Sequence, residues 1–437
     1  FLDFNLISTD TRKIEKDCIF FALKGDNFNG NKFASEAISK GAKFAIIDEK
    51  EFNLNSNFIL VDNVLSTLQE LANYHRNYLG LKIIGLTGSN GKTTTKELIN
   101  SALRKRYKTI ATSGNLNNHI GVPLTLLRMD KTTEIGIVEM GANHLNEIEF
   151  LCRIAEPDYG YITNFGKAHL EGFGSEKGVI KGKSELYDYL KTNNNQIFIN
   201  NEDPIQLKQL GDYLNFIKFG LTDNVIKIDF IEANPFVSVL FNNYKIKSNL
   251  IGSYNFTNIS AAIAIGNYFK VTDTDIKDAI ESYTPENNRS QIITRNSNKI
   301  ILDAYNANPS SMLAMLNSFS KQNYENKLCI LGDMLELGEY SKLEHKSIIN
   351  LCKKLELECI YVGEEFNKVS SKAFSSRVKL EEYLQKNSIK NKNILLKGSR
   401  GIGLEKLEKY YEDGLLIKQT HPTKDLTIWN YSQKVQY

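Results

Sequence analysis

The sequence lacks the features that mark several common classes of protein. It has five cysteines in 437 residues, and none of them forms a C-x-x-C pair, so neither a disulfide framework nor a cysteine-based metal site is indicated. No apolar run approaches the roughly 20 residues that span a bilayer. The start of the chain, FLDFNLISTD, does not have the basic and then apolar layout of a signal peptide. We therefore expect reduced, buried thiols in a cytoplasmic protein without a membrane partner.

An excess of charge of one sign is also missing. The chain carries 54 Lys and Arg residues against 51 Asp and Glu residues, a net charge of +3 spread along its length. No broad basic surface is expected, which argues against a nucleic-acid partner, so any anionic ligand must be held locally. The chain has no initiating methionine, and we expect it to begin slightly inside the natural protein. A monomer without an obligate protein partner is the expectation.

The order of apolar runs predicts an α/β protein of three domains. At roughly 100 to 200 residues per domain, a chain of this length holds two to four of them. Residues 1–80 predict a small α/β unit, with strands at CIFFAL and FAIID and helices at KFASEAISKGA and STLQELANYHRNYLG. His75, in the second of these helices, is expected at the surface.

The remaining residues predict two further units and a tail. Residues 81–293 alternate buried strands with helical runs, the pattern of a mostly parallel sheet with crossover helices, and VIKIDFIEA and FVSVLFNNYKIKSNLI predict added hairpins. Residues 294–420 predict a smaller, Rossmann-like sheet, with strands at KIILDAY, KLCILGDM, CIYVGEE and NILLKGS. Residues 421–437 follow the last periodic helix, GLEKLEKYYEDGLL, and are expected to form a peripheral tail.

Residues 82–95, KIIGLTGSNGKTTT, predict a strand, a glycine-rich turn and a helix N-terminus. This arrangement presents backbone N–H groups and the positive end of a helix dipole to a phosphate. The segment is close to the phosphate loop G-x-x-x-x-G-K-[ST], although Leu86 fills the first glycine position. Lys92 would meet the β- and γ-phosphates and Thr93 a magnesium ion, so nucleotide binding is favoured over a ligand-free turn. The loop residues expected to hold the nucleotide are Gly88, Ser89, Asn90, Gly91, Lys92, Thr93 and Thr94.

Polar residues follow several expected strands, where the ligands of open α/β sheets collect. Glu139 ends the strand EIGIVE and is suited to hold the magnesium ion that Thr93 touches. Taken singly, His169 resembles a surface residue and Lys183 a solvated helix lysine. The amides of the loop SGNLNNHIGVP would either cap turns or bind a substrate, and they are Asn115, Asn117 and Asn118.

Nine ordered motifs carry a resemblance to a known family. They are TGSNGKTTT, GNLNNHIGVPLTLL, EMGANHLNEIEFL, ITNFGKAHLEGFGS, KGKSEL, GSYNFTNISAA, DAYNANPSSM, LGDMLELGE and LLKGSRG. Together they resemble the Mur ligase family from STDTRKIEKDCIFFALKG to about Tyr411. DAYNANPSSM, GNLNNHIGVP and LGDMLELGE are similar to the member that adds D-alanyl-D-alanine to a UDP-N-acetylmuramoyl tripeptide. The D-N-P-R signature of the relative that adds a diamino acid does not occur.

The resemblance implies two magnesium ions and a modified lysine. Lys92 would bind the phosphates of ATP, and Thr93 with Glu139 would hold one ion. His169 would hold the second ion together with Lys183, which is carbamylated by CO2 in this family. A carbamate supplies oxygen ligands where an ammonium has none.

The resemblance also assigns substrate contacts to residues of all three units. Asn258 matches the position that contacts adenine, and Arg289 and Asp303 match nucleotide-contacting positions of the closing domain. The residues expected near the UDP end of the substrate are Ser8, Asp10, Thr11 and Arg12. Those expected near the incoming dipeptide or the transferred phosphate are Asn306, Asn308, Lys397 and Arg400. The expected catalytic residues are Lys92, His169, Lys183, Arg289 and Asp303.

The chemistry implied is ATP-dependent amide synthesis, with ADP and phosphate as products. A substrate carboxylate would be phosphorylated to an acyl phosphate and then attacked by an amine. Because acyl phosphates hydrolyse readily, the domains are expected to close over the site. Two alternatives stay open. Folylpolyglutamate synthetase has the same phosphate loop and chemistry but should lack the STDTR unit, and a non-catalytic, nucleotide-controlled binding module would need no second metal site.

Overall fold

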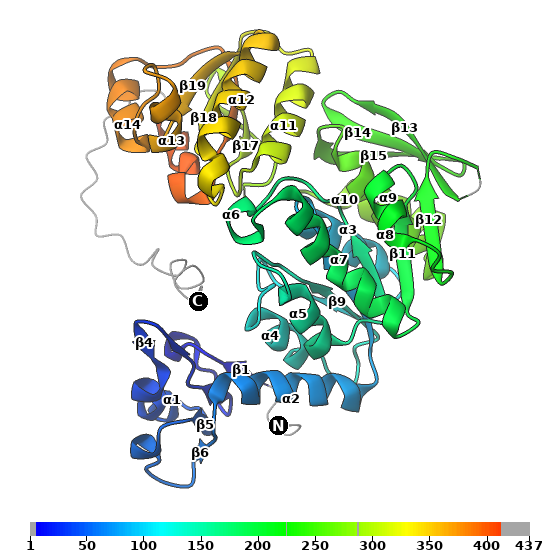
Figure 1. Cartoon of the computed structure of the whole chain (residues 1–437), viewed down its shortest axis with the longest axis vertical. Helices are drawn as coiled ribbons and strands as arrows, with labels where there is room; N and C mark the ends of the chain where they lie inside the picture. Colours follow the sequence, from blue (N-terminus) through cyan, green and yellow to red (C-terminus); the bar gives the residue numbers. More distant parts are fainter. Residues whose placement is uncertain (1–5, 224, 286–287, 412–437) are drawn as a thin grey trace.

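The chain folds into three units, each built on its own β-sheet (Figure 1). The computed structural model describes residues 6–223, 225–285 and 288–411. The first and third units lie at opposite ends of the molecule, with the second unit between them (Figure 1). The predicted fold class, α/β with three domains, is confirmed.

The first unit is a small parallel sheet with the strand order β1-β2-β5-β6. It consists of β1 (Ile7–Ser8), β2 (Ile19–Phe21), β5 (Phe44–Ile47) and β6 (Phe58–Leu60), a hairpin of β3 (Lys24–Gly25) and β4 (Phe28–Asn29), and α1 (Ala34–Ser39). Strands β2 and β5 lie where CIFFAL and FAIID predict them. Strands β1 and β6 were not predicted, because two or three residues are too few to show a pattern.

Helix α2 (Val64–Leu79) joins the first unit to the second. The side chain of Asn63 accepts a hydrogen bond from Ser66 N at 2.8 Å, and Gly80 ends the helix with a φ of 63°. The buried face of α2 packs against the second unit. The expectation that His75 lies at the surface was wrong, because His75 lies on this face with 4% of its surface exposed. Its Nε2 atom lies 2.7 Å from the carbonyl oxygen of Met129, so a hydrogen on Nε2 can donate to that oxygen.

The second unit is a nine-stranded sheet with the order β15-β14-β13-β12-β11-β10-β7-β9-β8. Its strands are β7 (Lys82–Thr87), β8 (Thr109–Ala111), β9 (Ile135–Glu139), β10 (Tyr159–Ile162), β11 (Gln196–Asn200), β12 (Phe216–Gly220), β13 (Ile226–Ala233), β14 (Phe236–Phe241) and β15 (Tyr244–Ile251). The pairs from β8 to β13 are parallel, and β13, β14 and β15 form antiparallel hairpins. Both features were predicted and are confirmed.

Helices cover both faces of this sheet. One face packs against α3 (Lys92–Leu103), α9 (Asn255–Tyr268) and α10 (Asp273–Ser282). The other face packs against α4 (Gly121–Leu127), α5 (Glu147–Ala155), α6 (Leu170–Phe173) and α7 (Glu176–Thr192), and α8 (Pro204–Leu210) follows β11. Neighbouring residues of β7, such as Ile83 and Ile84, belong to opposite cores, and both are fully buried. This burial explains why the strand reads as a continuous apolar run.

The third unit is a five-stranded sheet with the order β16-β17-β20-β18-β19. It consists of β16 (Gln291–Arg295), β17 (Asn298–Asp303), β18 (Lys327–Gly332), β19 (Glu358–Val362) and β20 (Asn393–Lys397), with α11 (Pro309–Lys321), α12 (Ser341–Lys354), α13 (Glu364–Val369) and α14 (Arg377–Lys386). Strand β16 pairs with β17 but begins at Gln291, inside the predicted second unit. We therefore propose a domain boundary just before this strand. The last described segment, Leu404–Tyr411, is a 3-10 helix, and the expected tail lies outside the described residues.

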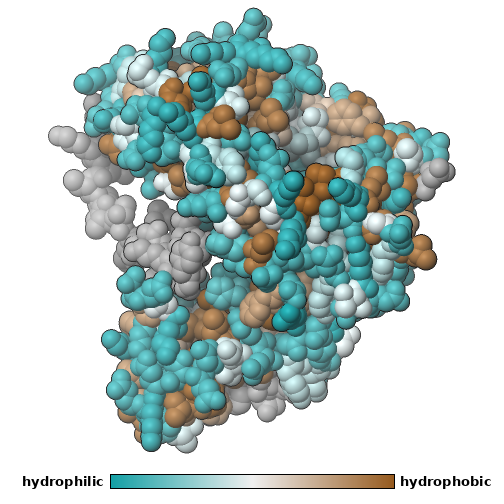
Figure 2. Space-filling model, in the orientation of Figure 1, coloured by the Kyte–Doolittle hydropathy of each residue, from teal (hydrophilic) through white to brown (hydrophobic). Residues whose placement is uncertain are grey.

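The surface agrees with the balanced composition. The face shown in Figure 2 is mainly hydrophilic, with apolar residues scattered over it. Within the described ranges, none of the helices has the length and apolar character that a membrane span needs. All five cysteines are free thiols, four of them buried, as predicted.

Replacement of Arg76 should weaken the attachment of α2 to the second unit. Its guanidinium donates to the carbonyl oxygens of Ala155 at 3.1 Å and Glu156 at 2.6 Å and pairs with Asp158 at 3.0 Å. We expect Arg76→Met to lower the free energy of unfolding by about 2 kcal/mol, since it leaves buried acceptors unpaired. Urea unfolding followed by circular dichroism measures this loss. The matched control is Arg104→Met at an exposed position. Equal effects of the two substitutions would contradict the prediction.

Candidate active site

One cavity of about 1130 Å³ collects residues from the second and third units and from α2. It lies beyond the carboxyl ends of β7, β9 and β10 of the second unit and of β17, β18 and β20 of the third. Such strand ends are where open α/β sheets bind ligands. Leu65 and Gln69 of α2 extend the wall of the cavity toward the first unit.

The phosphate loop between β7 and α3 requires its glycines. Gly88 has a φ of 138°, and a Cβ atom there would lie 2.0 Å from Oγ1 of Thr163. Gly91 has a φ of 79°, and a Cβ atom there would lie 2.6 Å from Oδ1 of Asn258. Because Gly91 also stands at the N-cap of α3 without a capping side chain, the first N–H groups of the helix have no side-chain acceptor at that position. This is the geometry of an anion site.

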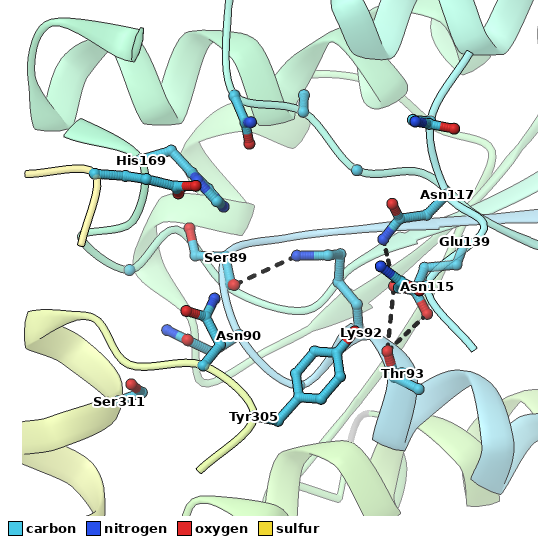
Figure 3. A pocket seen from close by; sticks show the side chains of 18 of the residues that line it. Ser89, Asn90, Lys92, Thr93, Asn115, Asn117, Glu139, His169, Tyr305 and Ser311 are labelled. Carbon is cyan, nitrogen blue, oxygen red and sulfur yellow. Dashed lines mark hydrogen bonds and ion pairs between the residues drawn. The ribbon is translucent and has the colours of Figure 1, made fainter. Parts of the chain in front are cut away.

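Lys92 bends back over this loop (Figure 3). Its Nζ atom donates to the carbonyl oxygen of Gly88 at 2.7 Å and lies 3.4 Å from that of Ser89. Burial lowers the pKa of the Lys92 ammonium below its ordinary value; Glu139 opposes this shift, and the positive charge of Arg289 adds to it. A cation held this way in a partly buried loop is well placed for a phosphate.

Glu139 is a buried carboxylate at the centre of a hydrogen-bonded group. Thr93 Oγ1 donates to one of its oxygens at 3.0 Å, and Asn117 Nδ2 donates to the other at 2.8 Å (Figure 3). The buried ammonium of Lys96 lies 3.9 Å from the same carboxylate. Only 1% of the surface of Glu139 is exposed, so its carboxylate depends on these partners.

The donor set fits a magnesium ion that is shared with a substrate. Among the residues described, no three or more His, Cys, Asp and Glu side chains cluster as a metal cage would require. Thr93 and Glu139 nevertheless supply a hydroxyl and a carboxylate beside the phosphate loop. Mg²⁺ is commonly held by one or two carboxylates together with substrate phosphates and water. The residues present therefore fit this ion in a nucleotide complex.

Lys183 and His169 lie near this cavity in unusual environments. Lys183 of α7 is 1% exposed, so it is not the solvated helix lysine that its sequence context suggested. Its Nζ atom donates to the carbonyl oxygen of Ala142 at 2.8 Å and lies 5.0 Å from the centre of the Phe173 ring. Burial lowers the pKa of Lys183 well below its ordinary value, and the charge of Lys92 adds to the shift.

His169 is bonded across the interface to the third unit. Its Nδ1 atom pairs with the carboxylate of Glu336. Burial lowers the pKa of His169 below its ordinary value, the Glu336 carboxylate opposes this, and the charges of Lys183 and Lys92 add to it. A neutral imidazole with a lone pair is the form that binds a metal ion.

The third unit contributes an ion pair and two arginine side chains that lie close to one tyrosine ring. Asp303 and Lys397 end the paired strands β17 and β20, and their side chains meet at 2.6 Å. The guanidinium of Arg289 lies 3.7 Å from the centre of the Tyr305 ring, and that of Arg400 lies 5.6 Å from it. Two guanidinium groups on one ring, close to Lys92, make this side of the cavity favourable for an anion.

The phosphate loop also touches the third unit directly. Asn308 Nδ2 donates to Asn90 Oδ1 at 2.7 Å, and the reverse contact measures 3.4 Å. Asn308 is also the N-cap of α11, where its side chain accepts a hydrogen bond from Ser311 N at 2.9 Å. Nearby, the backbone N–H of Lys167 donates to Ser310 Oγ at 2.8 Å. The loop is therefore in contact with the third unit in this arrangement.

The structure gathers many, but not all, of the predicted site residues. Predicted residues that line the cavity are Ser89, Asn90, Gly91, Lys92, Thr93, Thr94, Asn115, Asn117, Asn118, Glu139, His169, Asn258, Arg289, Asp303, Asn306, Lys397 and Arg400. The predicted residues that are not among the described residues lining it are Ser8, Asp10, Thr11, Arg12, Gly88, Lys183 and Asn308. The amide of Asn258 accepts from Thr95 Oγ1 at 3.0 Å and donates to Asn255 at 2.7 Å.

Among the residues of the cavity that the sequence analysis missed, Tyr305 and Glu336 contact predicted site residues. Both lie inside motifs that were noted, DAYNANPSSM and LGDMLELGE. Nothing in those motifs singles them out, because their partners, Arg289, Arg400 and His169, come from other parts of the chain. The available signal was only their position after a predicted strand.

Three family models match the chain in order. The Mur ligase family catalytic domain matches residues 3–78, the Mur ligase middle domain matches 86–266, and the Mur ligase glutamate ligase domain matches 288–400. The chain is also similar to UDP-N-acetylmuramoyl-tripeptide–D-alanyl-D-alanine ligases. It is 34% identical to that of Bacillus subtilis (strain 168) over 431 residues, 92% of each chain. It is 30% identical to that of Escherichia coli (strain K12) over 433 residues, 93% of each chain.

Solved structures give the same picture. MurF from Acinetobacter baumannii matches with a TM-score of 0.81 and 29% identity over 92% of each chain. The MurF ligase from Thermotoga maritima, solved in complex with ADP, matches with a TM-score of 0.80 and 26% identity, covering 93% of this chain and 96% of that one.

Asn308→Ser should separate helix capping from the contact with the phosphate loop. Serine is a good N-cap, so α11 should keep its stability, while the amide bond to Asn90 is lost. We expect ADP to bind several-fold more weakly, as measured by calorimetry, because the loop loses a hydrogen bond of about 1 kcal/mol. Asn317→Ser, later on the same helix, is the control. The same loss of affinity in the Asn90→Ala background would contradict the proposed pairing, since the effect should vanish there.

Proposed function

The chain belongs to the Mur ligase family, and on this premise we propose that it joins D-alanyl-D-alanine to a UDP-N-acetylmuramoyl tripeptide with ATP as the energy source. The observation that carries the proposal is a cavity in which the phosphate loop faces the strand ends of the third unit. It is supported by similarity to ligases of this activity over more than nine-tenths of the chain. The pathway would be the synthesis of peptidoglycan precursors.

The reaction needs a carboxylate to be made electrophilic. A carboxylate oxygen of the tripeptide attacks the γ-phosphorus of ATP, and ADP leaves, which gives an acyl phosphate. The amine of D-alanyl-D-alanine then attacks the acyl carbon, loses a proton, and releases phosphate that carries the former carboxylate oxygen. Lys92 and the N-terminus of α3 are proposed to hold the phosphates, with Arg289 facing them from the third unit.

We propose two magnesium ions for this site. Thr93 and Glu139 would hold one ion, and His169 with a carbamylated Lys183 would hold the other. When bound, the ions supply neutralising charge for the phosphoryl oxygens. The protein's own task is to hold the Glu139 carboxylate aimed at the cavity, which its contacts with Thr93, Asn117 and Lys96 favour.

Lys183 has the environment that carbamylation requires. CO2 adds only to a neutral amine: the nitrogen lone pair bonds to carbon and a proton leaves, so the product is an anionic carbamate. Burial lowers the pKa of Lys183 well below its ordinary value, which shifts the balance toward the neutral amine. The carbamate nitrogen keeps one hydrogen, which can still donate to the Ala142 carbonyl that now accepts from Lys183.

The roles of the remaining units are also proposals. Ser8, Asp10, Thr11 and Arg12 would hold the UDP end of the precursor, and α2 would connect them to the cavity through Leu65 and Gln69. Asn115, Asn117, Asn118, Asn306 and Asn308 would contact the peptide substrates or their surroundings. Asn258 would face the adenine. We propose that the protein acts as a monomer. A cytoplasmic location would give access to ATP and nucleotide-linked precursors.

The rival functions make different demands. Folylpolyglutamate synthase from Mycobacterium tuberculosis matches with a TM-score of 0.59 at 11% identity, which shows a shared fold alone. It covers 80% of this chain, whereas the D-alanyl-D-alanine ligases cover over nine-tenths. A nucleotide-controlled binding module would hydrolyse ATP without any peptide substrate.

Phosphate release measured with purified protein distinguishes these functions. We expect fast release only when ATP, UDP-N-acetylmuramoyl tripeptide and D-alanyl-D-alanine are all present, because the acyl phosphate waits for the amine in a site that excludes water. Release that depends on folate and glutamate would identify the synthetase instead. A rate that is unchanged when both peptide substrates are omitted would identify a switch.

Lys183→Ala should remove a metal ligand without unfolding the protein. We expect turnover to fall by about 100-fold or more, since a group that places charge beside the transferred phosphate is lost. A short carboxylic acid such as acetate should restore part of the activity by filling the vacated position. Lys181→Ala, at an exposed position of the same helix, is the control. Full activity of Lys183→Ala would contradict the carbamate.

A further inference from the structure

The segment 333–345 of the third unit lies along the segment 167–174 of the second. The backbone N–H of Glu171 donates to the carbonyl oxygen of Glu336 at 3.2 Å, and Tyr340 OH donates to the carbonyl oxygen of Gly174 at 3.3 Å. Lys167 pairs with Glu344 at 3.1 Å. These contacts fix the relative position of the two segments around one further pair, His169 and Glu336.

The backbone of Glu336 is held from its own unit as well. Leu335 N donates to Ser399 Oγ at 3.0 Å, and Met334 N donates to His345 Nε2 at 3.1 Å. Both Glu336 and His169 adopt left-handed backbone conformations, with φ values of 62° and 52°. Such conformations are uncommon for residues with side chains and persist where surrounding contacts impose them. The structure therefore maintains strained backbone on both sides of this pair.

The contact between His169 and Glu336 leaves the second imidazole nitrogen, Nε2, available to the cavity. Nδ1 of His169 is engaged by the Glu336 carboxylate, which must accept a hydrogen from it. The neutral ring then carries its lone pair on Nε2. In Figure 3 the side chain of His169 extends toward the part of the cavity where the Lys92 ammonium lies. A carboxylate on the far nitrogen is the arrangement that orients metal-binding histidines in many proteins.

We propose that Glu336 is a positioning residue that holds His169 in its metal-binding orientation, so that the second ion site is complete only when the third unit lies against the second. This inference deepens the proposed function and rests on its assignment of His169 to an ion. In this proposal Glu336 of the third unit fixes the tautomer and the ring orientation of His169, a proposed metal ligand in the second unit. Domain contact would then be coupled to metal affinity.

The first test reads the tautomer of His169 by nitrogen NMR of the histidine-labelled full chain, without added metal. We expect Nδ1 of His169 to carry the hydrogen in the wild-type protein. Glu336→Ala should shift the ring toward the Nε2–H form, whereas Glu336→Gln, whose amide oxygen can still accept the hydrogen bond, should keep the wild-type form. The same tautomer in Glu336→Ala and wild type would overturn the proposal.

The second test measures Mn²⁺ binding by electron paramagnetic resonance in the presence of ADP. We expect Glu336→Ala to lower the affinity for one Mn²⁺ ion by roughly 10- to 100-fold, the range for substitutions of residues that hydrogen-bond to metal-bound histidines. Glu336→Gln should weaken it less, and Glu339→Ala, an exposed glutamate of the same segment, should not change it. In the His169→Ala background, Glu336→Ala should have no further effect.

The outcomes separate the proposal from its premise. Additive losses of Mn²⁺ affinity in the variant that carries both His169→Ala and Glu336→Ala would overturn the positioning role. Equal losses in Glu336→Gln and Glu336→Ala would also overturn it, because Glu336 would then be a direct metal ligand. If His169→Ala bound Mn²⁺ as tightly as the wild-type protein does, the proposal would also be overturned. The metal-binding and tautomer results could be as expected while the protein does not use D-alanyl-D-alanine. That outcome would support the positioning role of Glu336 and contradict only the proposed substrates.

Discussion

Two sheets present the carboxyl ends of their parallel strands to the same cavity, and the candidate site depends on this constraint. From the second unit come the phosphate loop and Glu139, and from the third come Asp303 and Lys397. Neither sheet alone brings together a phosphate site and the cations that face it. Because the two sheets belong to separate units, contacts between side chains such as Asn90 and Asn308 must hold the two units in position relative to each other.

Two buried ionisable groups at or beside the cavity, Glu139 and Lys183, differ in their partners. Glu139 is nearly fully buried, and its hydrogen bonds from Thr93 and Asn117 together with the nearby ammonium of Lys96 offset its loss of water. Lys183 is equally buried, but the hydrogen bond it makes is to a neutral carbonyl, so its charged form is disfavoured. A buried amine whose charged form is disfavoured is a poor structural cation. It is well suited to become an anionic ligand by the addition of CO2, as we propose.

The sequence predicted the features that depend on neighbouring residues. The phosphate loop, the buried strand before it and the helix in STLQELANYHRNYLG are local patterns, and the structure contains them. It could not predict contacts between distant segments. His169 and Glu336 are 167 positions apart, and Asn90 and Asn308 are 218 apart, so no spacing rule connects them. His75 shows the same limit: only the packing of α2 on the second unit buries it.

The central claim is that the two facing sheets activate a carboxylate by phosphoryl transfer, and oxygen labelling tests it most directly. The terminal carboxylate of the UDP-N-acetylmuramoyl tripeptide would carry ¹⁸O in both positions, and the phosphate released in the presence of ATP and D-alanyl-D-alanine would be examined by mass spectrometry. The account predicts one labelled oxygen in each released phosphate and the other in the new amide. Product formed with unlabelled phosphate would contradict it, since the carboxylate oxygen would then never have been bonded to phosphorus.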